Sequence, residues 1–131
     1  IHTHREKALA AAEQKAANRL TEAERKAAVK RAAQMLAEKT AHFAKEMGVT
    51  YGRITIREQK TRWGSCSSAG NLNYNWKLVL MPERVMDYVV IHELAHQKEM
   101  NHSARFYAVV AQQMPDYKVW QSWLKEHGRE Y

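Results

Sequence analysis

The first third of the chain follows a helical pattern of polar and apolar positions. Residues 5–47 are rich in Ala, Glu, Lys, Arg and Gln, all of which favour helix. Thr21 and Glu24 form a capping-box pattern, which predicts one helix before this point and a longer helix over 22–47, with Gly48 as its stop. The apolar residues of the longer helix recur at helical spacing and predict a packing stripe made of Ala28, Ala32, Met35, Leu36, Phe43 and Met47.

After Tyr51 the pattern changes to that of strands. The segment "RITIRE" alternates, with Ile54 and Ile56 on one face, and predicts a strand. The segment "SSAGN" is typical of a turn. A second strand is predicted in "NLNYNWKLVL", whose apolar side carries Leu72, Tyr74, Trp76 and Leu78.

Three further helices are predicted in the last third of the chain. Pro82 suits the first turn of a helix over 82–99, and two more are expected over 104–113 and 115–127, with Gly128 closing the last. The fold class is therefore α+β. The helix before Thr21 is polar nearly all round, so we expect two parts: a helical, exposed arm over 1–21 and a folded domain over 22–131.

Length and composition narrow the class of protein. A chain of 131 residues with 45% hydrophobic residues fits one domain with a modest core. No apolar run approaches the ~20 residues that span a bilayer, so no membrane partner is expected. Cys66 is the single cysteine, which excludes an internal disulfide and an all-cysteine metal site and favours a reducing, cytoplasmic setting. The chain begins with Ile1 rather than Met, which suggests a longer parent.

The positive charge is spread along the chain. The net charge is +7, with ten basic and six acidic residues up to Thr50 and eleven basic and eight acidic residues after it. No block of like charges stands out, so we expect a solvated helix surface with at most weak attraction to nucleic acid.

The segment "HELAH", residues 92–96, contains candidate metal ligands and a candidate catalytic base. His92 and His96 are four residues apart, so they project about 40° from one another on a helix and can reach one ion. Glu93 borders this ligand row without belonging to it, which suits a base that activates a zinc-bound water. Val85 and Val89 continue the row of His92 towards the N-terminus and predict that the site faces a packed interior.

A catalytic zinc needs a third protein ligand and one open position. His102 follows His96 by six residues, so it can reach the ion only if the helix breaks; we expect the break in "EMN", with Asn101 in a left-handed conformation. The spacing matches the HExxHxxxxxH pattern of short-linker zinc peptidases, although a glycine common in that pattern is replaced by Glu99. The competing third ligands are acidic residues from later helices, Glu126 and Asp116.

Two segments together resemble a known family. Residues 62–107, "RWGSCSSAGNLNYNWKLVLMPERVMDYVVIHELAHQKEMNHSARFY", and 114–124, "MPDYKVWQSWL", are similar to the YgjP-like family of metal-dependent hydrolases in the zincin clan, over roughly 27–127. A looser similarity joins the chain to the WLM and SprT-like families, which are associated with proteolysis of DNA-bound proteins. The resemblance implies a minimal zincin-like fold, in which a small sheet packs on the long helix and the HExxH helix.

The resemblance also implies roles for residues. It implies Zn²⁺ held by His92, His96 and His102, with Glu93 as the catalytic glutamate. In zincins an edge strand commonly lies above the metal cleft, and by analogy we place one of the two predicted strands there. The side chains near the motifs are expected to have structural or surface roles: Trp63, Cys66, Phe106 and Tyr107 as packing residues and Arg62 as an exposed charge. The alternatives are Cys66 as a fourth, inhibitory zinc ligand, Arg62 as a stabiliser of developing negative charge and Tyr107 as a hydrogen-bond partner of the transition state.

The sequence therefore predicts a zinc-dependent hydrolase, most simply a metallopeptidase acting on a peptide or protein. One alternative keeps the metal site and changes the substrate, for example to a nucleotide phosphoanhydride. Another is a DNA-associated protease of the WLM or SprT type. A nucleic-acid-binding module with a structural zinc is disfavoured, because structural zinc sites normally have four protein ligands, often cysteines.

Overall fold

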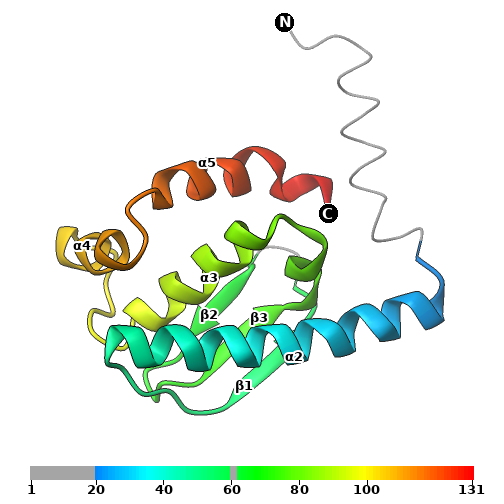
Figure 1. Cartoon of the computed structure of the whole chain (residues 1–131), viewed down its shortest axis with the longest axis horizontal. Coiled ribbons are helices and arrows are strands. Elements are labelled where there is room, and N and C mark those ends of the chain that lie inside the picture. Colours follow the sequence, from blue (N-terminus) through cyan, green and yellow to red (C-terminus); the bar gives the residue numbers. More distant parts are fainter. Residues whose placement is uncertain (1–19, 60–61) are drawn as a thin grey trace, which may run out of the picture.

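A computed structural model describes residues 20–59 and 62–131. The predicted first helix, and most of the predicted arm over 1–21, lie outside these ranges. The α+β class is confirmed, and the predicted helices and strands among the described residues occur in the predicted order, with one additional strand (Figure 1). The elements are α2 (Glu22–Met47), β1 (Ile54–Arg57), β2 (Gly64–Cys66), β3 (Leu72–Asn75), the 3₁₀ helix η2 (Trp76–Leu80), α3 (Glu83–Ala95), α4 (Ala104–Gln113), α5 (Tyr117–His127) and the 3₁₀ turn η3 (Gly128–Glu130).

The long helix α2 begins and ends where its capping residues predict. The Thr21 side chain accepts a hydrogen bond from the Glu24 backbone N–H, and the Glu24 side chain accepts one from Thr21 N–H, so the capping box is confirmed. Gly48 ends the helix with a φ of 68°, a left-handed conformation that favours glycine. One row of the helix is fully buried and consists of Ala28, Ala32, Leu36, Thr40, Ala44 and Met47.

The buried row differs from the predicted stripe at its edges. Met35 and Phe43 are only partly buried, whereas Thr40 is fully buried. The Thr40 hydroxyl donates to the Leu36 carbonyl at 2.6 Å and lies 3.0 Å from the Tyr74 hydroxyl. Because these contacts satisfy the hydroxyl oxygen, Thr40 can be buried in the core. The pattern of apolar residues did not predict this, since threonine is polar.

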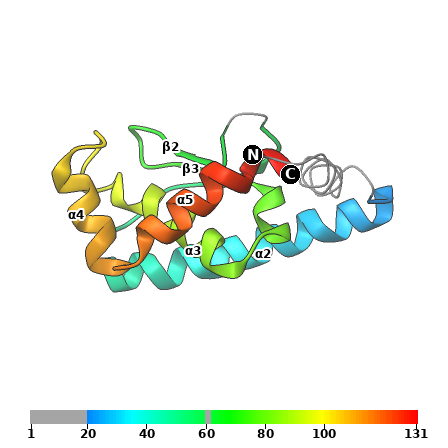
Figure 2. The same ribbon diagram turned by 90° about the horizontal axis from the view of Figure 1, so that it is seen from above.

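The sheet has three strands in the order β1-β3-β2, one more than the hydrophobic pattern predicts. β1 pairs parallel to β3, with Ile54 opposite Leu72, and β2 pairs antiparallel to β3, with Gly64 opposite Tyr74. The additional strand β2 has three residues and lies at an edge of the sheet. Figure 2 shows α2 and α3 on one side of this sheet.

The second predicted strand is shorter than expected. β3 ends at Asn75, and Trp76 and Leu78 belong to η2 rather than to the strand. The Asn75 side chain accepts a hydrogen bond from Lys77 N–H, which starts the 3₁₀ turn. Trp76 and Leu78 are nevertheless buried. The apolar pattern therefore predicted their burial correctly, but it predicted a strand where the chain forms a 3₁₀ helix.

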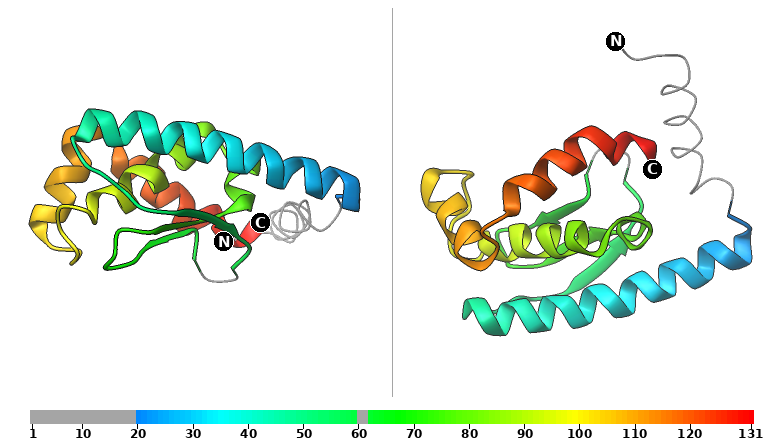
Figure 3. Two further views of the ribbon diagram at one scale, coloured as in Figure 1. Left: turned by 90° about the horizontal axis from the view of Figure 1, so that it is seen from below. Right: turned by 45° about the horizontal axis from the view of Figure 1, so that its top comes forward.

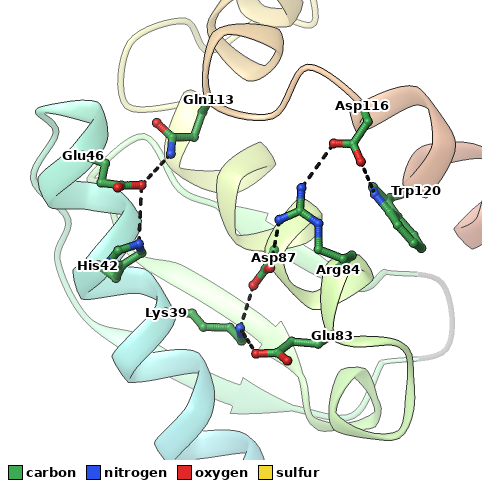
Figure 4. Close-up of polar contacts among 9 residues, drawn as sticks. All are labelled: Lys39, His42, Glu46, Glu83, Arg84, Asp87, Gln113, Asp116 and Trp120. Atoms are coloured by element: carbon green, nitrogen blue, oxygen red, sulfur yellow. Dashed lines mark hydrogen bonds and ion pairs between the residues drawn. The ribbon is translucent and has the colours of Figure 1, made fainter.

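Helix α3 lies in the middle of the helical layer, with α2 on one side and α5 on the other (Figures 1 and 3). Polar contacts link the three helices (Figure 4). Asp87 of α3 accepts hydrogen bonds from Lys39 of α2 at 2.7 Å and from Arg84 at 3.3 Å. Arg84 also contacts Asp116, next to α5, at 3.2 Å. Among the described residues, every helix is too short or too polar to span a bilayer.

Candidate metal centre

The HExxH helix ends earlier than predicted. α3 stops at Ala95, with His96 as its C-cap, whereas the sequence predicted a helix to residue 99. A turn follows, in which the N–H groups of Gln97 and Lys98 donate to the carbonyls of Leu94 and Ala95. Asn101 does not have a positive φ, so the expected left-handed conformation there is wrong. The reversal starts directly after the second histidine, and the five residues between His96 and His102 form the turn.

This turn brings three imidazoles together. His102 Nε2 lies 3.2 Å from His92 Nε2 and 3.1 Å from His96 Nε2. The three side chains form a group in which one ligand atom from each lies within 4.8 Å of the others. His96 is buried, His92 is half-buried and His102 is exposed, so the group opens to solvent on the side of His102. The group includes neither of the competing acidic residues, Asp116 and Glu126.

Hydrogen bonds on the outer ring nitrogens orient two of these rings. His96 Nδ1 lies 3.2 Å from the Glu99 carbonyl, which can only accept, so Nδ1 carries the proton and Nε2 has a free lone pair. His92 Nδ1 lies 3.4 Å from the Tyr88 hydroxyl. Burial lowers the pKa of His92 to about 4 and also lowers the pKa of His96. Both rings are therefore neutral at pH 7, the form that binds metals.

The donor set fits a tetrahedral metal ion. Zn–N bonds of roughly 2.0–2.1 Å in a tetrahedron place neighbouring nitrogens ~3.3 Å apart, close to the observed 3.1 and 3.2 Å. Hydrogen bonds alone cannot satisfy both short contacts of His102 Nε2, because this nitrogen has at most one proton to donate and two neighbouring nitrogens. A cation at the centre would satisfy three lone pairs at once.

The ring of Phe106 contacts the imidazole rings of all three histidines. Its ring centroid lies 4.9 Å from those of His92 and His102 and 4.5 Å from that of His96. Phe106 is fully buried, which confirms its predicted place in the core. It is held at the start of α4, where the Ser103 side chain accepts a hydrogen bond from Phe106 N–H. Tyr107 is half-buried and stacks on Tyr117.

Glu93 lies beside the cluster under the edge strand. Its carboxylate Oε1 is 4.0 Å from His96 Nε2, and the residue is only 5% exposed. Burial raises the pKa of Glu93 to about 8, against an opposing effect of the Arg62 charge. A Cβ at Gly64 would lie 3.1 Å from the Glu93 carboxylate, so the absence of a side chain there lets β2 approach the site. The edge strand next to the site is thus β2, and neither of the two strands found in the hydrophobic pattern.

A cavity of about 250 Å³ adjoins His92 and Glu93. Its other walls come from β2 and the residues before it, from α3 and from α5: Arg62, Trp63, Gly64, Tyr88, Val89 and Leu124. Sequence reasoning missed Tyr88 and Leu124. Tyr88 could have been found, because it precedes His92 by four residues and shares its helix face. Leu124 lies 32 residues after His92 and only the docking of α5 brings it there.

The remaining candidate residues lie outside the group of three histidines. Asp116 accepts hydrogen bonds from Arg84 and Trp120. The Glu126 side chain is 71% exposed. Cys66 is half-buried and its thiol contacts the Gln97 amide at 3.7 Å, which agrees with a packing role. Arg62 is exposed, as predicted.

Solved structures share this fold. The metallopeptidase zymogen abylysin of Pyrococcus abyssi is similar with a TM-score of 0.62 and 23% identity, over 70% of this chain and 93% of that chain. The metallopeptidase zymogen jannalysin of Methanocaldococcus jannaschii is similar with a TM-score of 0.54 and 19% identity, over 64% and 90%. At these identities the likeness concerns the fold. Among curated proteins, no sequence match was found.

A family model gives the more specific result. The model of the YgjP-like metallopeptidase domain matches residues 1–127, nearly the whole chain, and this range includes both segments that carry the resemblance. Its metallopeptidase description agrees with the fold of the two zymogens and with a histidine cluster that could hold an ion. The chain therefore belongs to the YgjP-like metallopeptidase family.

Proposed function

We propose that this metallopeptidase is a zinc-dependent peptidase in which His92, His96 and His102 hold Zn²⁺ and Glu93 is the general base. The observation that carries the proposal is the position of His102 Nε2, 3.2 Å from His92 Nε2 and 3.1 Å from His96 Nε2, with the buried Glu93 carboxylate 4.0 Å from His96 Nε2. Three nitrogen ligands and one open position are typical of catalytic rather than structural zinc.

The open position is expected on the solvent side of the cluster. His102 is exposed, whereas His96 is buried and the buried Phe106 packs against all three rings. When bound, zinc acts as a Lewis acid that lowers the pKa of water and polarises a carbonyl group. We therefore expect a substrate to reach the metal from the side on which His102 is exposed.

The proposed role of Glu93 is to transfer a proton. The nearby cation would favour its carboxylate form and so lower a pKa that burial alone raises to about 8. A carboxylate oxygen of Glu93 accepts a proton from the attacking water and then gives it to the leaving nitrogen. The same burial that raises the pKa keeps bulk water away from this proton, so the transfer stays within the site.

An extended peptide suits the surroundings of the cluster. β2 is an edge strand, so its outer backbone groups can pair with an added strand, a mode of binding that tolerates many sequences. Gly64 brings this edge within contact distance of Glu93. The cavity beside His92 and Glu93 can hold one side chain of the bound peptide.

The test compares substrate classes on protein reconstituted with one equivalent of zinc. Casein and a set of unstructured peptides are incubated with the protein and cleavage is followed by mass spectrometry, while nucleoside triphosphates are tested for phosphate release. We expect peptide cleavage that a chelator stops and added zinc restores. Phosphate release without peptide cleavage would replace the proposal with a phosphoanhydride hydrolase. Cleavage that requires added DNA would support a DNA-associated protease.

A further inference from the structure

The cavity beside His92 and Glu93 has an arginine on its solvent side. Arg62 lines the cavity and is exposed, whereas Glu93 is buried. The charge of Arg62 lies close enough to Glu93 to oppose the rise in the pKa of that carboxyl group. The other walls are mostly apolar or aromatic and come from Trp63, Tyr88, Val89 and Leu124. The cavity therefore combines an apolar interior with a positive charge towards solvent.

Asn75, at the end of β3, holds the backbone that carries Arg62. The Asn75 side-chain amide donates to the Gln59 carbonyl at 2.9 Å and to the Arg62 carbonyl at 3.3 Å. The Asn75 backbone N–H donates to the Trp63 carbonyl at 2.9 Å. Asn75 is itself only 2% exposed. Because one buried residue binds three carbonyl groups of this segment, the backbone at Arg62 is held next to the sheet while its side chain remains exposed.

The two residues after Arg62 also pack closely. A Cβ at Gly128 would lie 3.1 Å from Trp63 Nε1, so the indole of Trp63 packs against the backbone that follows α5. A Cβ at Gly64 would lie 3.1 Å from the Glu93 carboxylate. Three consecutive residues thus supply the charge, one wall of the cavity and the close approach to Glu93.

The guanidinium group of Arg62 has no acidic partner within the part of the chain that the structure describes. No carboxylate of a described residue lies within ion-pair distance of it. Arg84, by contrast, pairs with Asp87 and Asp116. A guanidinium binds a carboxylate through two parallel hydrogen bonds. Such donors next to the candidate site are therefore available to a ligand.

We infer that Arg62 is a specificity-determining residue that binds a carboxylate on the substrate residue next to the scissile bond. The inference rests on the proposed peptidase function and names the substrate class that this site favours. The cavity borders both His92 and Glu93, so a side chain held in it belongs to a residue directly next to the bond under attack. Its methylene groups contact the apolar walls, and its carboxylate meets Arg62 on the solvent side.

The charges of the site favour a carboxylate over an ammonium group. With a divalent cation on the three histidines, that cation and Arg62 outweigh the single negative charge of Glu93. The carboxylate has two sources, the side chain of Glu or Asp and the free C-terminus of a peptide that ends one residue after the bond. Separate peptides distinguish them.

The test starts from a peptide that the zinc-loaded wild type cleaves. The residues on either side of the cleaved bond are replaced in turn by Glu, Gln or Lys, and kcat/KM is measured. We expect one position to favour Glu over Gln by roughly 5- to 30-fold, the effect of a charge-assisted hydrogen bond that stays partly solvated. Peptides that end one residue after the bond, as free acids and as amides, show whether a terminal carboxylate is bound instead.

Substitutions of Arg62 show whether the arginine causes the preference. Arg62→Met should abolish the preference for a carboxylate, and Arg62→Glu should make Lys the favoured residue. Arg31→Met removes an exposed arginine of α2 and is the matched control, which should keep the wild-type preference. An equal fall in kcat for the Glu, Gln and Lys peptides in Arg62→Met would make Arg62 a stabiliser of the transition state and contradict the inference.

Equilibrium binding gives a readout that does not require cleavage. Zinc-loaded Glu93→Gln, with and without Arg62→Met, is titrated with labelled peptides that differ only in Glu, Gln or Lys at one position or in a free or amidated C-terminus. A wild type that cleaves no peptide would overturn the proposed function, but tighter binding of a carboxylate that Arg62→Met abolishes would still support the inference. Equal binding and equal cleavage of carboxylate and neutral peptides would overturn it. Tighter binding of a nucleoside triphosphate that depends on Arg62 would assign the arginine to phosphate groups and contradict the inference.

Discussion

Helices α3 and α5 lie side by side and both border the candidate site, but they are built differently. All but three of the thirteen residues of α3 are buried, the exceptions being Glu83, Arg84 and His92. None of the eleven residues of α5 is fully buried. α3 supplies His92 and Glu93, whereas α5 supplies Leu124 at the cavity wall.

The difference assigns separate tasks to the two helices. Reacting groups must be held within fractions of an ångström, and a helix packed on all sides provides that precision. A helix attached by one face can shift at lower cost, because fewer contacts are lost when it moves. We therefore expect changes in α3 and its candidate ligands to have large effects and changes in α5 to have small, local ones.

The largest effect is expected at Glu93. Glu93→Gln keeps the shape of the side chain and removes the proton acceptor, so peptide cleavage should fall by roughly 10²- to 10⁴-fold while zinc remains bound. Cleavage assays and metal analysis of the same preparation measure both quantities. Glu99→Gln, in the turn after the motif, is the matched control. Loss of zinc from Glu93→Gln would make Glu93 a ligand, and retained cleavage would remove it as the base.

His102→Ala should come next. Structural zinc binding is worth roughly 10–16 kcal/mol over four ligands, so losing one of three ligands should weaken binding by at least roughly 100- to 1,000-fold. The zinc-dependent rise in melting temperature should shrink accordingly. His42→Ala removes an exposed histidine of α2 and serves as the control. Stoichiometric zinc in His102→Ala at nanomolar free metal would direct attention to Glu126 and Asp116.

A matched pair of leucines tests the packing difference directly. Leu94 in α3 is fully buried, and Leu94→Ala should lower the free energy of unfolding by about 3 kcal/mol or more. Leu124 in α5 is half-buried, so Leu124→Ala should cost about 1 kcal/mol. Urea denaturation of both variants gives the values. Equal losses would mean that α5 is as firmly packed as α3.

The buried carboxyl group of Glu93 should make the metal-free protein sensitive to pH. Its pKa is raised from 4.5 to about 8 on folding, so the native state holds a proton that the unfolded state loses, and stability falls as pH rises between these values. The loss should be about 2 kcal/mol between pH 5 and 7. His92, with its pKa lowered to about 4, acts in the opposite direction below pH 6.5.

The difference between wild type and Glu93→Gln isolates the carboxyl contribution. Denaturation of both metal-free proteins across this pH range should show the variant gaining stability relative to the wild type as pH rises. A constant difference would mean that Glu93 titrates normally in the native state.

The smallest effect is expected for DNA binding by the basic residues, which does not depend on the difference between α3 and α5. The first fifty residues carry ten basic and six acidic residues, so few net phosphate contacts are available. Binding to duplex DNA should be weaker than about 1 µM at physiological salt, with a shallow dependence on salt. Fluorescence anisotropy over a salt series measures both. Tight, steeply salt-dependent binding would favour the DNA-associated protease.

Local chemistry in the sequence determined much of this protein. Thr21, Glu24 and Gly48 predict both ends of α2, because capping bonds join residues three or four apart. The spacing of His92 and His96 likewise places them on one helix face, because residues four apart lie about one turn apart on a helix. The sequence also required a break before His102, because a continuous helix would point it away.

Only the tertiary structure decided the rest. The break falls after Ala95 and not at "EMN", β3 ends at Asn75, and β2 forms although its three residues carry no strand signal. β2 exists because β3 offers it an edge to pair with and Gly64 lets it approach Glu93. Leu124 reaches the cavity only when α5 packs across α3. Such contacts join residues far apart in the chain, and their free energy exists only once the helices and the sheet are assembled.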